Sequence, residues 1–391
     1  MLEKIAVNFL IPSKGRSPMT PKRSALTLFA LILAVAPTLH AANRRLLAYY
    51  YYGDKTSAIP YNASNIPYAQ LTHIIHSNIS PAPQGDGSLG VPTTFLEPDL
   101  ITRAHKAGVK VEVSLAGPPY LIANIAASAT LRATFAENLA NFVIANGYDG
   151  LDFDYEVPYD QTEALNFTLL IQAVRTLLPA GQYLISAAVS SSPGDYGVYD
   201  FAGMIPLLDF FNVMTYDFHG PWTNHSGHNS PLYLSPIDPG QEGSLKTSTD
   251  LYRYLYDVPD EQINLGTAFY GYGFDVDGLW YFCGCENAIG LNYQQIEQII
   301  AAGGWTQYTD PLADAPYLIS SNPNHVGFIT YDTPASTTLK VGYALTTRGL
   351  GGVFMWEISE DYNGQNQPLM NAMYSAFVKA NASSQAAAHQ Q

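Results

Sequence analysis

Short apolar runs rich in β-branched and aromatic residues recur along the chain, and segments with helical spacing of apolar positions separate them. Strands of a parallel sheet have this composition, and helices usually connect them. Helices are predicted at residues 97–107, 128–145, 163–178 and 248–256. Strands are predicted at residues 46–52, 71–80, 110–115, 150–156, 183–189, 210–216, 263–270 and 352–358. Eight strands alternating with helices predict an α/β protein with a (β/α)₈ TIM barrel.

The interval between the last two predicted strands is longer than a single crossover needs. A helical pattern at residues 291–302 and an apolar run at 326–331 predict a small α+β insertion there. We assign residues 275–348 to this insertion and the return crossover, and residues 42–274 and 349–379 to the barrel. Residues 380–391 are mostly Ala, Ser and Gln without apolar spacing, which predicts a disordered tail.

The first 41 residues have the features of a leader. Lys22 and Arg23 precede a long apolar run, and small residues follow it, which is the order found in a secretory signal peptide. The alternative is a membrane anchor, but the run is short for a span and contains Pro37. We therefore expect initiation at Met19, removal of residues 1–41 and a secreted protein, either extracellular or periplasmic. No later stretch is apolar for long enough to cross a bilayer, so no membrane association is expected.

Composition narrows the range of partners. The chain carries 18 Lys and Arg against 33 Asp and Glu, a net charge of −15, which excludes binding to nucleic acid through its phosphates. Apolar residues make up 47% of the chain, so there is ample material for a hydrophobic core. We also expect the protein to be a monomer. Cys283 and Cys285 are either two thiols or one tight bridge, because no further Cys or nearby His completes a zinc site. We predict neither a metal nor a cofactor.

Three carboxylates stand at steps of two within one predicted strand: Asp152, Asp154 and Glu156. Side chains of a strand alternate between faces, so these three project together, and the apolar residues between them project to the other face. In a barrel the acidic face is the interior, where repulsion raises at least one pKa and leaves a proton on the cluster. A surface strand or a calcium loop is the alternative, and the alternating apolar residues argue against both. Glu156, at the carboxyl end of the strand, is the candidate general acid.

Residues 149–156, Asp-Gly-Leu-Asp-Phe-Asp-Tyr-Glu, resemble the signature of family 18 glycoside hydrolases, the chitinases. Residues 213–222, Val-Met-Thr-Tyr-Asp-Phe-His-Gly-Pro-Trp, are similar to the sixth-strand segment of the bacterial-type members. Further similar segments follow in the family's order: residues 227–232, 269–271, 331–332 with 340, and 351–357. Together these segments extend over nearly the whole chain after the leader.

The resemblance implies hydrolysis of β-1,4-linked N-acetylglucosamine polymers, chitin above all, with retention of configuration. In this family the substrate's own 2-acetamido oxygen attacks the anomeric carbon and forms an oxazolinium intermediate, so the usual carboxylate nucleophile is absent. Glu156 is then expected to protonate the leaving oxygen and later to activate water. Asp154 is expected to bind the acetamido N–H, and Asp152 to share a proton with Asp154.

The resemblance also implies substrate-binding residues. Tyr216 is expected to donate to the acetamido oxygen, with Asp217 and Met214 orienting the same sugar. Trp356 is expected to form the floor of the cleaved subsite and to precede a cis peptide bond, with aromatic walls from Tyr270 and Tyr50.

The chain departs from the family pattern at three binding positions. Asn78 stands where relatives carry Phe, Gly117 belongs to a third-strand segment without its usual aromatic residue, and Tyr272 replaces an Arg. Two other functions therefore stay open: an endo-β-N-acetylglucosaminidase acting on N-glycans or cell-wall glycan, and a chitin-binding lectin without activity. Glu156 is present, which argues against the lectin.

Overall fold

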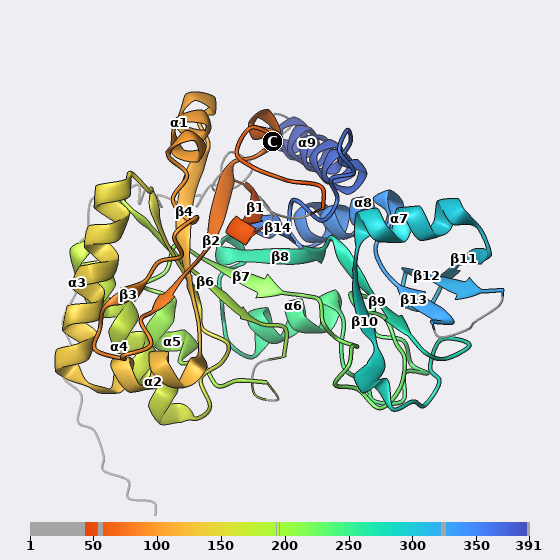
Figure 1. The fold of residues 1–391 in the computed structure, drawn as a ribbon, viewed down its shortest axis with the longest axis horizontal. Helices are drawn as coiled ribbons and strands as arrows, with labels where there is room; N and C mark the ends of the chain where they lie inside the picture. Colours follow the sequence, from red (N-terminus) through yellow and green to blue (C-terminus); the bar gives the residue numbers. More distant parts are fainter. Residues whose placement is uncertain (1–43, 54–57, 193, 195, 322–325, 389–391) are drawn as a thin grey trace, which may run out of the picture. The chain divides into compact units, whose positions relative to one another are not determined.

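Eight parallel strands close into a barrel, which confirms the predicted (β/α)₈ architecture (Figure 1). A computed structural model of the chain describes residues 44–53, 58–192, 194, 196–321 and 326–388, so the predicted leader lies outside the described residues. Around the barrel the order is β1-β14-β8-β7-β6-β5-β4-β2, and pairing of β2 with β1 closes it. The strands are β1 (Arg45–Tyr51), β2 (His73–Pro81), β4 (Lys110–Ala116), β5 (Gly150–Asp154), β6 (Leu184–Ser190), β7 (Phe210–Met214), β8 (Ile263–Ala268) and β14 (Gly352–Trp356).

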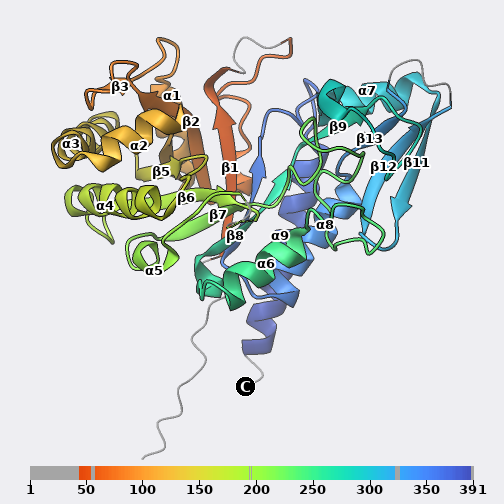
Figure 2. The ribbon, with the colours of Figure 1, turned by 90° about the horizontal axis from the view of Figure 1, so that it is seen from below.

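Helices surround this sheet on its outer face (Figure 2). They are α1 (Pro98–Ala107), α2 (Pro119–Ala127), α3 (Ala129–Asn146), α4 (Gln161–Leu177), α5 (Phe201–Met204), α6 (Leu245–Tyr254), α8 (Pro334–Gly342) and α9 (Pro368–Ala388). Short turns of helix and a two-residue strand complete the barrel: η3 (Tyr68–Gln70), β3 (Leu89–Gly90), η4 (Asp260–Gln262) and η6 (Tyr343–Thr347). Within the described ranges, no helix combines the length and the apolar character that crossing a membrane requires.

The last helix corrects one prediction. Residues 380–391 were expected to be a disordered tail, but α9 runs without a break from Pro368 to Ala388. Alanine has the highest helix propensity of all residues, so an Ala-rich segment that follows a packed helix extends it. The absence of apolar spacing indicated that the segment lacks a buried face, which is different from lacking helical structure.

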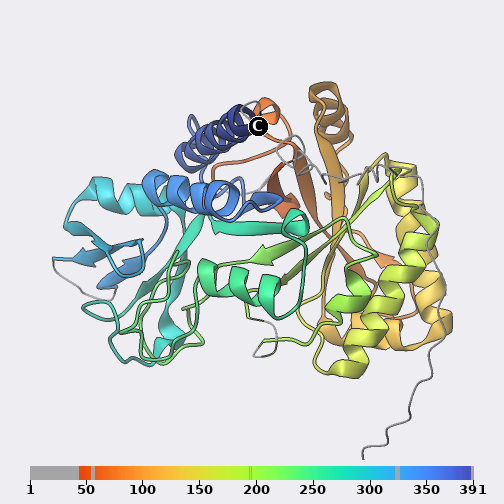
Figure 3. The ribbon, with the colours of Figure 1, turned by 180° about the vertical axis from the view of Figure 1, so that it is seen from behind.

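A second, antiparallel sheet is inserted between β8 and β14 and lies beside the barrel (Figure 3). Its strand order is β10-β9-β13-β12-β11, and it begins at Tyr270, five residues before the predicted start of the insertion. Its elements are β9 (Tyr270–Phe274), η5 (Cys285–Asn287), β10 (Ile289–Asn292), α7 (Tyr293–Ala302), β11 (Trp305–Asp310), β12 (Ala315–Ser320) and β13 (Phe328–Thr330). Cys283 and Cys285 form a disulfide beside η5, which is the second of the two alternatives.

The alternation along β5 separates core from site. Phe153 and the following Tyr155 pack edge-on against Phe167 of α4, with ring centroids 5.6 and 5.2 Å apart from it. Asp152 and Asp154 face the other way, into the barrel, and both are buried. Burying the aromatic face therefore fixes the acidic face inside the barrel.

The loop that follows β5 leads into α4, whose first turn depends on one exposed side chain. Asp160 Oδ1 accepts hydrogen bonds from the backbone N–H groups of Thr162 and Glu163, at 2.8 and 2.9 Å. We expect Asp160→Ala to lower the free energy of unfolding by about 1 kcal/mol, because these N–H groups lose their partner. Urea unfolding measures this, and Asp160→Asn, which retains a capping oxygen, should lose much less. Equal losses in the two variants would contradict the capping role.

Candidate active site

The carboxylate of Asp152 lies at the centre of the barrel and is fully buried. Ser114 and Ser186 are its register partners on the two neighbouring strands, and their hydroxyls donate to it at 3.0 and 2.6 Å. From across the barrel, Tyr49 and Asn212 donate at 3.1 and 3.3 Å. Four donors from four strands thus compensate much of the cost of burying one carboxylate. Burial still raises the pKa of Asp152, although each of these hydrogen bonds lowers it.

The polar network continues toward the opposite end of the barrel. Burial together with repulsion from Asp152 raises the pKa of the buried Glu112 well above its ordinary value. The protonated Glu112 therefore donates to the Ser186 hydroxyl, 3.0 Å away, while that hydroxyl donates its own proton to Asp152. Asn264 donates to Asn212 at 2.9 Å and accepts from the Arg45 guanidinium at 3.0 Å. Hydrogen-bonded side chains therefore fill the barrel interior beneath the site, and they fix Asp152 in place.

Asp154 and Glu156 form a hydrogen-bonded pair above Asp152. Burial, followed by repulsion from Glu156 and Asp152, raises the pKa of Asp154 well above its ordinary value. Glu156 is accessible to solvent from the cavity, but the surrounding protein desolvates its carboxyl and raises its pKa as well. The pair therefore retains a proton in the pH range in which isolated carboxyl groups are already ionised. The partner of Asp154 in this arrangement is Glu156, whereas the expected proton sharing was with Asp152.

The segment after β7 brings a second set of groups to the same place. Asp217 adopts a left-handed backbone conformation, with φ of 62°, and its N–H donates to the Asn229 side chain at 2.9 Å. Its carboxylate Oδ1 accepts from the hydroxyls of Tyr270 and Tyr272, the latter at 3.0 Å. Desolvation raises the pKa of Asp217 despite these two donors. The first strand of the insertion thereby orients a carboxylate that belongs to the barrel.

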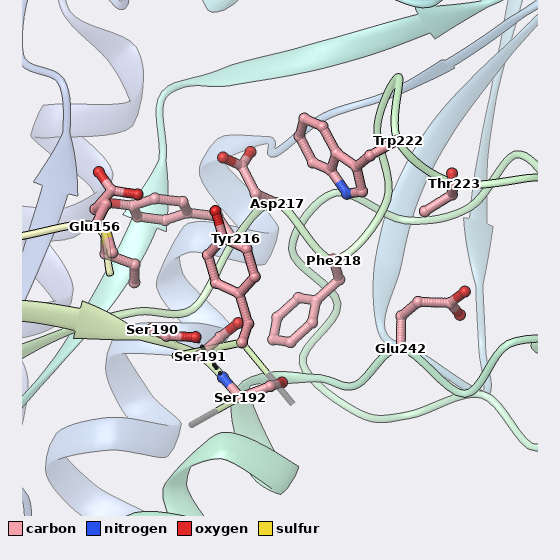
Figure 4. A pocket seen from close by; sticks show the side chains of 12 residues that line it. Glu156, Ser190, Ser191, Ser192, Tyr216, Asp217, Phe218, Trp222, Thr223 and Glu242 are labelled. Carbon is pink, nitrogen blue, oxygen red and sulfur yellow. Dashed lines mark hydrogen bonds between the residues drawn. The ribbon is translucent and has the colours of Figure 1, made fainter. Parts of the chain in front are cut away.

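These groups surround a cavity of about 230 Å³. Its lining residues are Tyr49, Asp154, Glu156, Ala188, Met214, Tyr216, Asp217, Tyr270 and Trp356. A neighbouring hollow of about 420 Å³ shares four of them and extends outward along the loops after β6 and β7 (Figure 4). Its further lining residues are Ser190, Ser191, Ser192, Tyr196, Phe218, Trp222, Thr223 and Glu242. Together they form a groove that runs from Glu156 past Trp222, a residue that is 58% exposed.

Most residues expected in the site come together in this cavity. Tyr216, Met214, Trp356 and Tyr270 line it beside the Asp154–Glu156 pair, and the peptide bond after Trp356 is cis as expected. Tyr272 reaches the site through Asp217. Asn78 and Gly117 line neither of the two hollows; Asn78 lies beside the third-strand segment, its amide donating to the Ala116 carbonyl at 3.5 Å.

The assignment of Tyr50 to substrate binding is wrong. Its side chain is fully buried, its ring stacks on His76 at 5.4 Å, and its hydroxyl donates to Glu97 at 2.9 Å, all on the helix side of β1. Tyr49 takes the expected place: it faces the barrel interior and packs against Trp356 at 5.4 Å. The prediction was wrong by one residue along β1, and a shift of one residue moves a side chain to the opposite face of the strand. The further residues of the outer hollow, most of them on the loops after β6 and β7, were also missed, since loops carry no periodicity.

A barrel with a carboxyl pair of raised pKa at the carboxyl end of a strand, beside an aromatic groove, is an arrangement typical of glycoside hydrolases. The family model of glycosyl hydrolases family 18 matches residues 45–361, which is most of the chain. The chain belongs to that family.

Several proteins named as chitinases are similar in sequence. Chitinase 1 of Aphanocladium album is 29% identical over 351 residues, covering 78% of this chain and 79% of that protein. Endochitinase 1 of Metarhizium robertsii is 33% identical over 262 residues, 61% of this chain and 58% of that protein. Chitinase A1 of Niallia circulans is 29% identical over 290 residues, covering 64% of this chain and 40% of that protein.

Solved structures share the fold. The Group IV chitinase of Ostrinia furnacalis, crystallised with allosamidin, superimposes with a TM-score of 0.76 at 22% identity, covering 86% of this chain and 99% of that chain. An immunomodulatory active chitinase from Trichuris suis gives a TM-score of 0.75 at 24% identity, covering 85% and 99%. At identities this low, the similarity to these structures shows a shared fold, which includes both the barrel and the insertion.

Ser186 links both buried carboxyls of the network, since it donates to Asp152 and lies within hydrogen-bond distance of Glu112, so its removal tests that network. We expect Ser186→Ala to lower the free energy of unfolding by about 1.5–3 kcal/mol at neutral pH, since the buried Asp152 loses a donor and the buried Glu112 loses its acceptor. Because this hydrogen bond lowers the pKa of Asp152, the loss concerns its ionised form and should shrink as pH falls and the carboxyl becomes protonated.

Urea unfolding at several pH values measures the effect of Ser186→Ala. Ser375→Ala, which removes an exposed hydroxyl from α9, is the matched control and should stay within about 0.5 kcal/mol of the wild type. A pH-independent loss would contradict the role assigned to Ser186.

Proposed function

We propose that this protein is a chitinase that hydrolyses β-1,4-linked N-acetylglucosamine polymers with retention, through an oxazolinium intermediate. The observation that carries the proposal is the hydrogen-bonded pair of Asp154 and Glu156, with raised pKa values, in one cavity with Tyr216 and Trp356. An inverting enzyme needs a separate carboxylate base, and a two-carboxylate retaining enzyme needs a carboxylate nucleophile across the scissile bond. Here the carboxyls of β5 share one face of one strand, which suits catalysis assisted by the substrate.

Glu156 is the general acid in this proposal. The Asp154–Glu156 pair retains a proton at a pH where free carboxyls have lost theirs, and Glu156, which is accessible from the cavity, is the member that passes this proton to the substrate. As the bond between the anomeric carbon and the glycosidic oxygen breaks, Glu156 transfers its proton to that oxygen. Water then gives a proton back to Glu156 and attacks the anomeric carbon, and the bond between that carbon and the acetamido oxygen breaks. This restores the starting state of the enzyme and frees the acetamido group.

The 2-acetamido group supplies the nucleophile in place of a protein carboxylate. Its carbonyl oxygen bonds to the anomeric carbon while positive charge develops on the ring that forms. Asp154 is placed to accept the acetamido N–H once its own proton shifts toward Glu156, and Asp152 below it adds negative charge held by four donors. The Tyr216 hydroxyl donates to the acetamido oxygen and orients it for attack.

Sugar rings of the substrate stack on exposed aromatic faces along the groove. Trp356 forms one wall of the catalytic cavity, supported from the barrel interior by Tyr49. Trp222 continues this surface on the outer hollow, and its ring meets Tyr272 of the insertion edge-on at 5.6 Å. The insertion thus builds one side of a groove that accommodates an extended chain, which favours a linear polymer as substrate over a branched N-glycan.

We further propose that the protein is exported and acts on its substrate outside the cytoplasm. The charged, apolar and small-residue regions of the first 41 residues support this, as does the disulfide between Cys283 and Cys285, because disulfides persist in oxidising compartments.

Replacing the acid tests the reaction directly. We expect Glu156→Gln to release products from chitin oligosaccharides at least about 100-fold more slowly than the wild type, because glutamine cannot donate the proton. Chromatography of the released sugars measures this, and Glu137→Gln, an isosteric change on the exposed face of α3, should retain the wild-type rate. Equal rates for the wild type and Glu156→Gln would refute the role of Glu156, and cleavage of N-glycans in place of chitin oligosaccharides would refute the substrate.

The pH dependence of the rate reports the environment of Glu156. The general acid must be protonated, so kcat/KM should fall as pH rises through the raised pKa of Glu156. Repulsion from Asp217 is one cause of that raised value, so Asp217→Asn should move this alkaline limb to lower pH. Kinetics from pH 4 to pH 9 measure the limb, with Glu137→Gln as the control for its position. An unchanged or upward-shifted limb in Asp217→Asn would contradict this electrostatic interaction.

A further inference from the structure

Two histidines and two carboxylates converge beside the groove, in the segment between β7 and α6. They are His219, His225, Asp238 and Glu242, and the first three are buried. One potential ligand atom from each lies within 4.8 Å of all the others. Glu242 also lines the outer hollow of the groove, where Figure 4 shows its side chain near Thr223. The cluster is therefore separate from the catalytic carboxyls but borders the same surface.

The outer nitrogens of the two rings fix which atoms face the centre. His219 Nδ1 lies 3.0 Å from the His228 carbonyl oxygen, and His225 Nδ1 lies 2.8 Å from the Asn224 side-chain oxygen. Both partners accept hydrogen bonds, so each Nδ1 carries a proton, and in a neutral ring Nε2 then presents a lone pair. The two Nε2 atoms face each other at 3.2 Å, and two carboxylate oxygens lie beside them. Four acceptors in contact repel one another unless a cation lies between them.

The spacing of these four atoms is close to that of ligand atoms around a tetrahedral zinc ion. Zinc binds imidazole nitrogen and carboxylate oxygen at about 2.0–2.2 Å, so tetrahedral ligand atoms are about 3.3–3.6 Å apart. Asp238 Oδ1 lies 3.5 Å from His219 Nε2 and 3.1 Å from His225 Nε2. Glu242 Oε2 lies 3.3 and 3.6 Å from the same two nitrogens. Oxygen-rich calcium sites have six to eight ligands and longer bonds, which these distances do not suit.

The surroundings close the cluster on its other sides. An added Cβ on Gly227 would lie 2.4 Å from His219 Nε2, so this position requires a residue without a side chain. The indole of Trp280 covers the rings of His219 and His225, with centroids 5.5 and 6.3 Å away. Trp280 belongs to the loop after β9, and a bridge between His225 and Phe282 joins that loop to the cluster. An apolar cover and oriented outer nitrogens are features of built metal sites.

We propose that His219, His225, Asp238 and Glu242 bind one Zn²⁺ ion. Four protein ligands leave no open coordination position, so the ion is structural and takes no part in hydrolysis. It ties residues 219–225 to residues 238–242 and so fixes the loop that carries Trp222 along the groove. No metal was predicted from the sequence, where Cys283 and Cys285 were the candidate ligands considered; only the fold brings His219 and His225 together with Asp238 and Glu242.

A shared proton is the competing explanation of the same geometry. Burial alone lowers the pKa of His219, but hydrogen bonds that its ring donates to Asp238 and Glu242, together with the negative charge of both, outweigh burial and raise the pKa to about 9. A protonated His219 would donate to these carboxylates without any metal. The two explanations differ in metal content and in the response to a chelator, which the following experiment measures.

The test uses the full chain purified without a histidine tag and dialysed against metal-free buffer. Mass spectrometry of the metals should find roughly one zinc per chain, and a chelator should lower the melting temperature by about 3 °C or more, with recovery on adding zinc chloride. Glu242→Gln, at the most accessible ligand, and His225→Gln should each lower zinc affinity at least about 100-fold in competition with a chromophoric chelator.

His228→Gln is the matched control, because His228 is a buried histidine of the same segment that pairs with Asp310 at 3.1 Å outside the cluster. It should retain the wild-type zinc content. A wild type that binds no zinc and melts identically with chelator and with zinc chloride would overturn the proposal in favour of the shared proton, whether or not any ligand variant folds. Unchanged zinc affinity in Glu242→Gln and His225→Gln would overturn the assignment of the ligands.

Discussion

A carboxylate buried at the centre of a barrel is the constraint on which this structure depends. The charge of Asp152 is tolerable only because Tyr49, Ser114, Ser186 and Asn212 donate to it from four different strands. Each of these donors is in reach only when the barrel is closed and its register is correct. The interior of the barrel is consequently a hydrogen-bonded network as much as an apolar core, and the apolar packing that stabilises the fold lies mainly between strands and helices.

The raised pKa values of Asp154 and Glu156 depend on this network. Asp154 lies directly above a carboxylate that is already saturated with donors, so its nearest proton partner is Glu156. Burial and repulsion then make retention of a proton the less costly state. The hydrogen-bonded network around Asp152 thereby creates the conditions for a general acid at the carboxyl end of the barrel. Of the residues in this network, Tyr49 alone lines the catalytic cavity.

The insertion forms one wall of the groove, and it also holds residues of the barrel in position. Tyr270 and Tyr272, on its first strand, hold the carboxylate of Asp217, and the loop after that strand places Trp280 over the histidines beside the groove. The segment after β7 therefore contacts the barrel on one side and the insertion on the other. Long loops gain a defined conformation from such contacts, and a substrate groove built on loops requires them.

The sequence by itself determined the eight-stranded barrel, the insertion and the placing of Asp152, Asp154 and Glu156 on one interior face, because these follow from local periodicity. Only the tertiary structure decided that Tyr49 and not Tyr50 faces the cavity, since four successive tyrosines leave the register of β1 undetermined. It also decided that His219 meets Glu242, and that Asp154 pairs with Glu156. Contacts of this kind depend on loop paths and burial, which residue spacing does not encode.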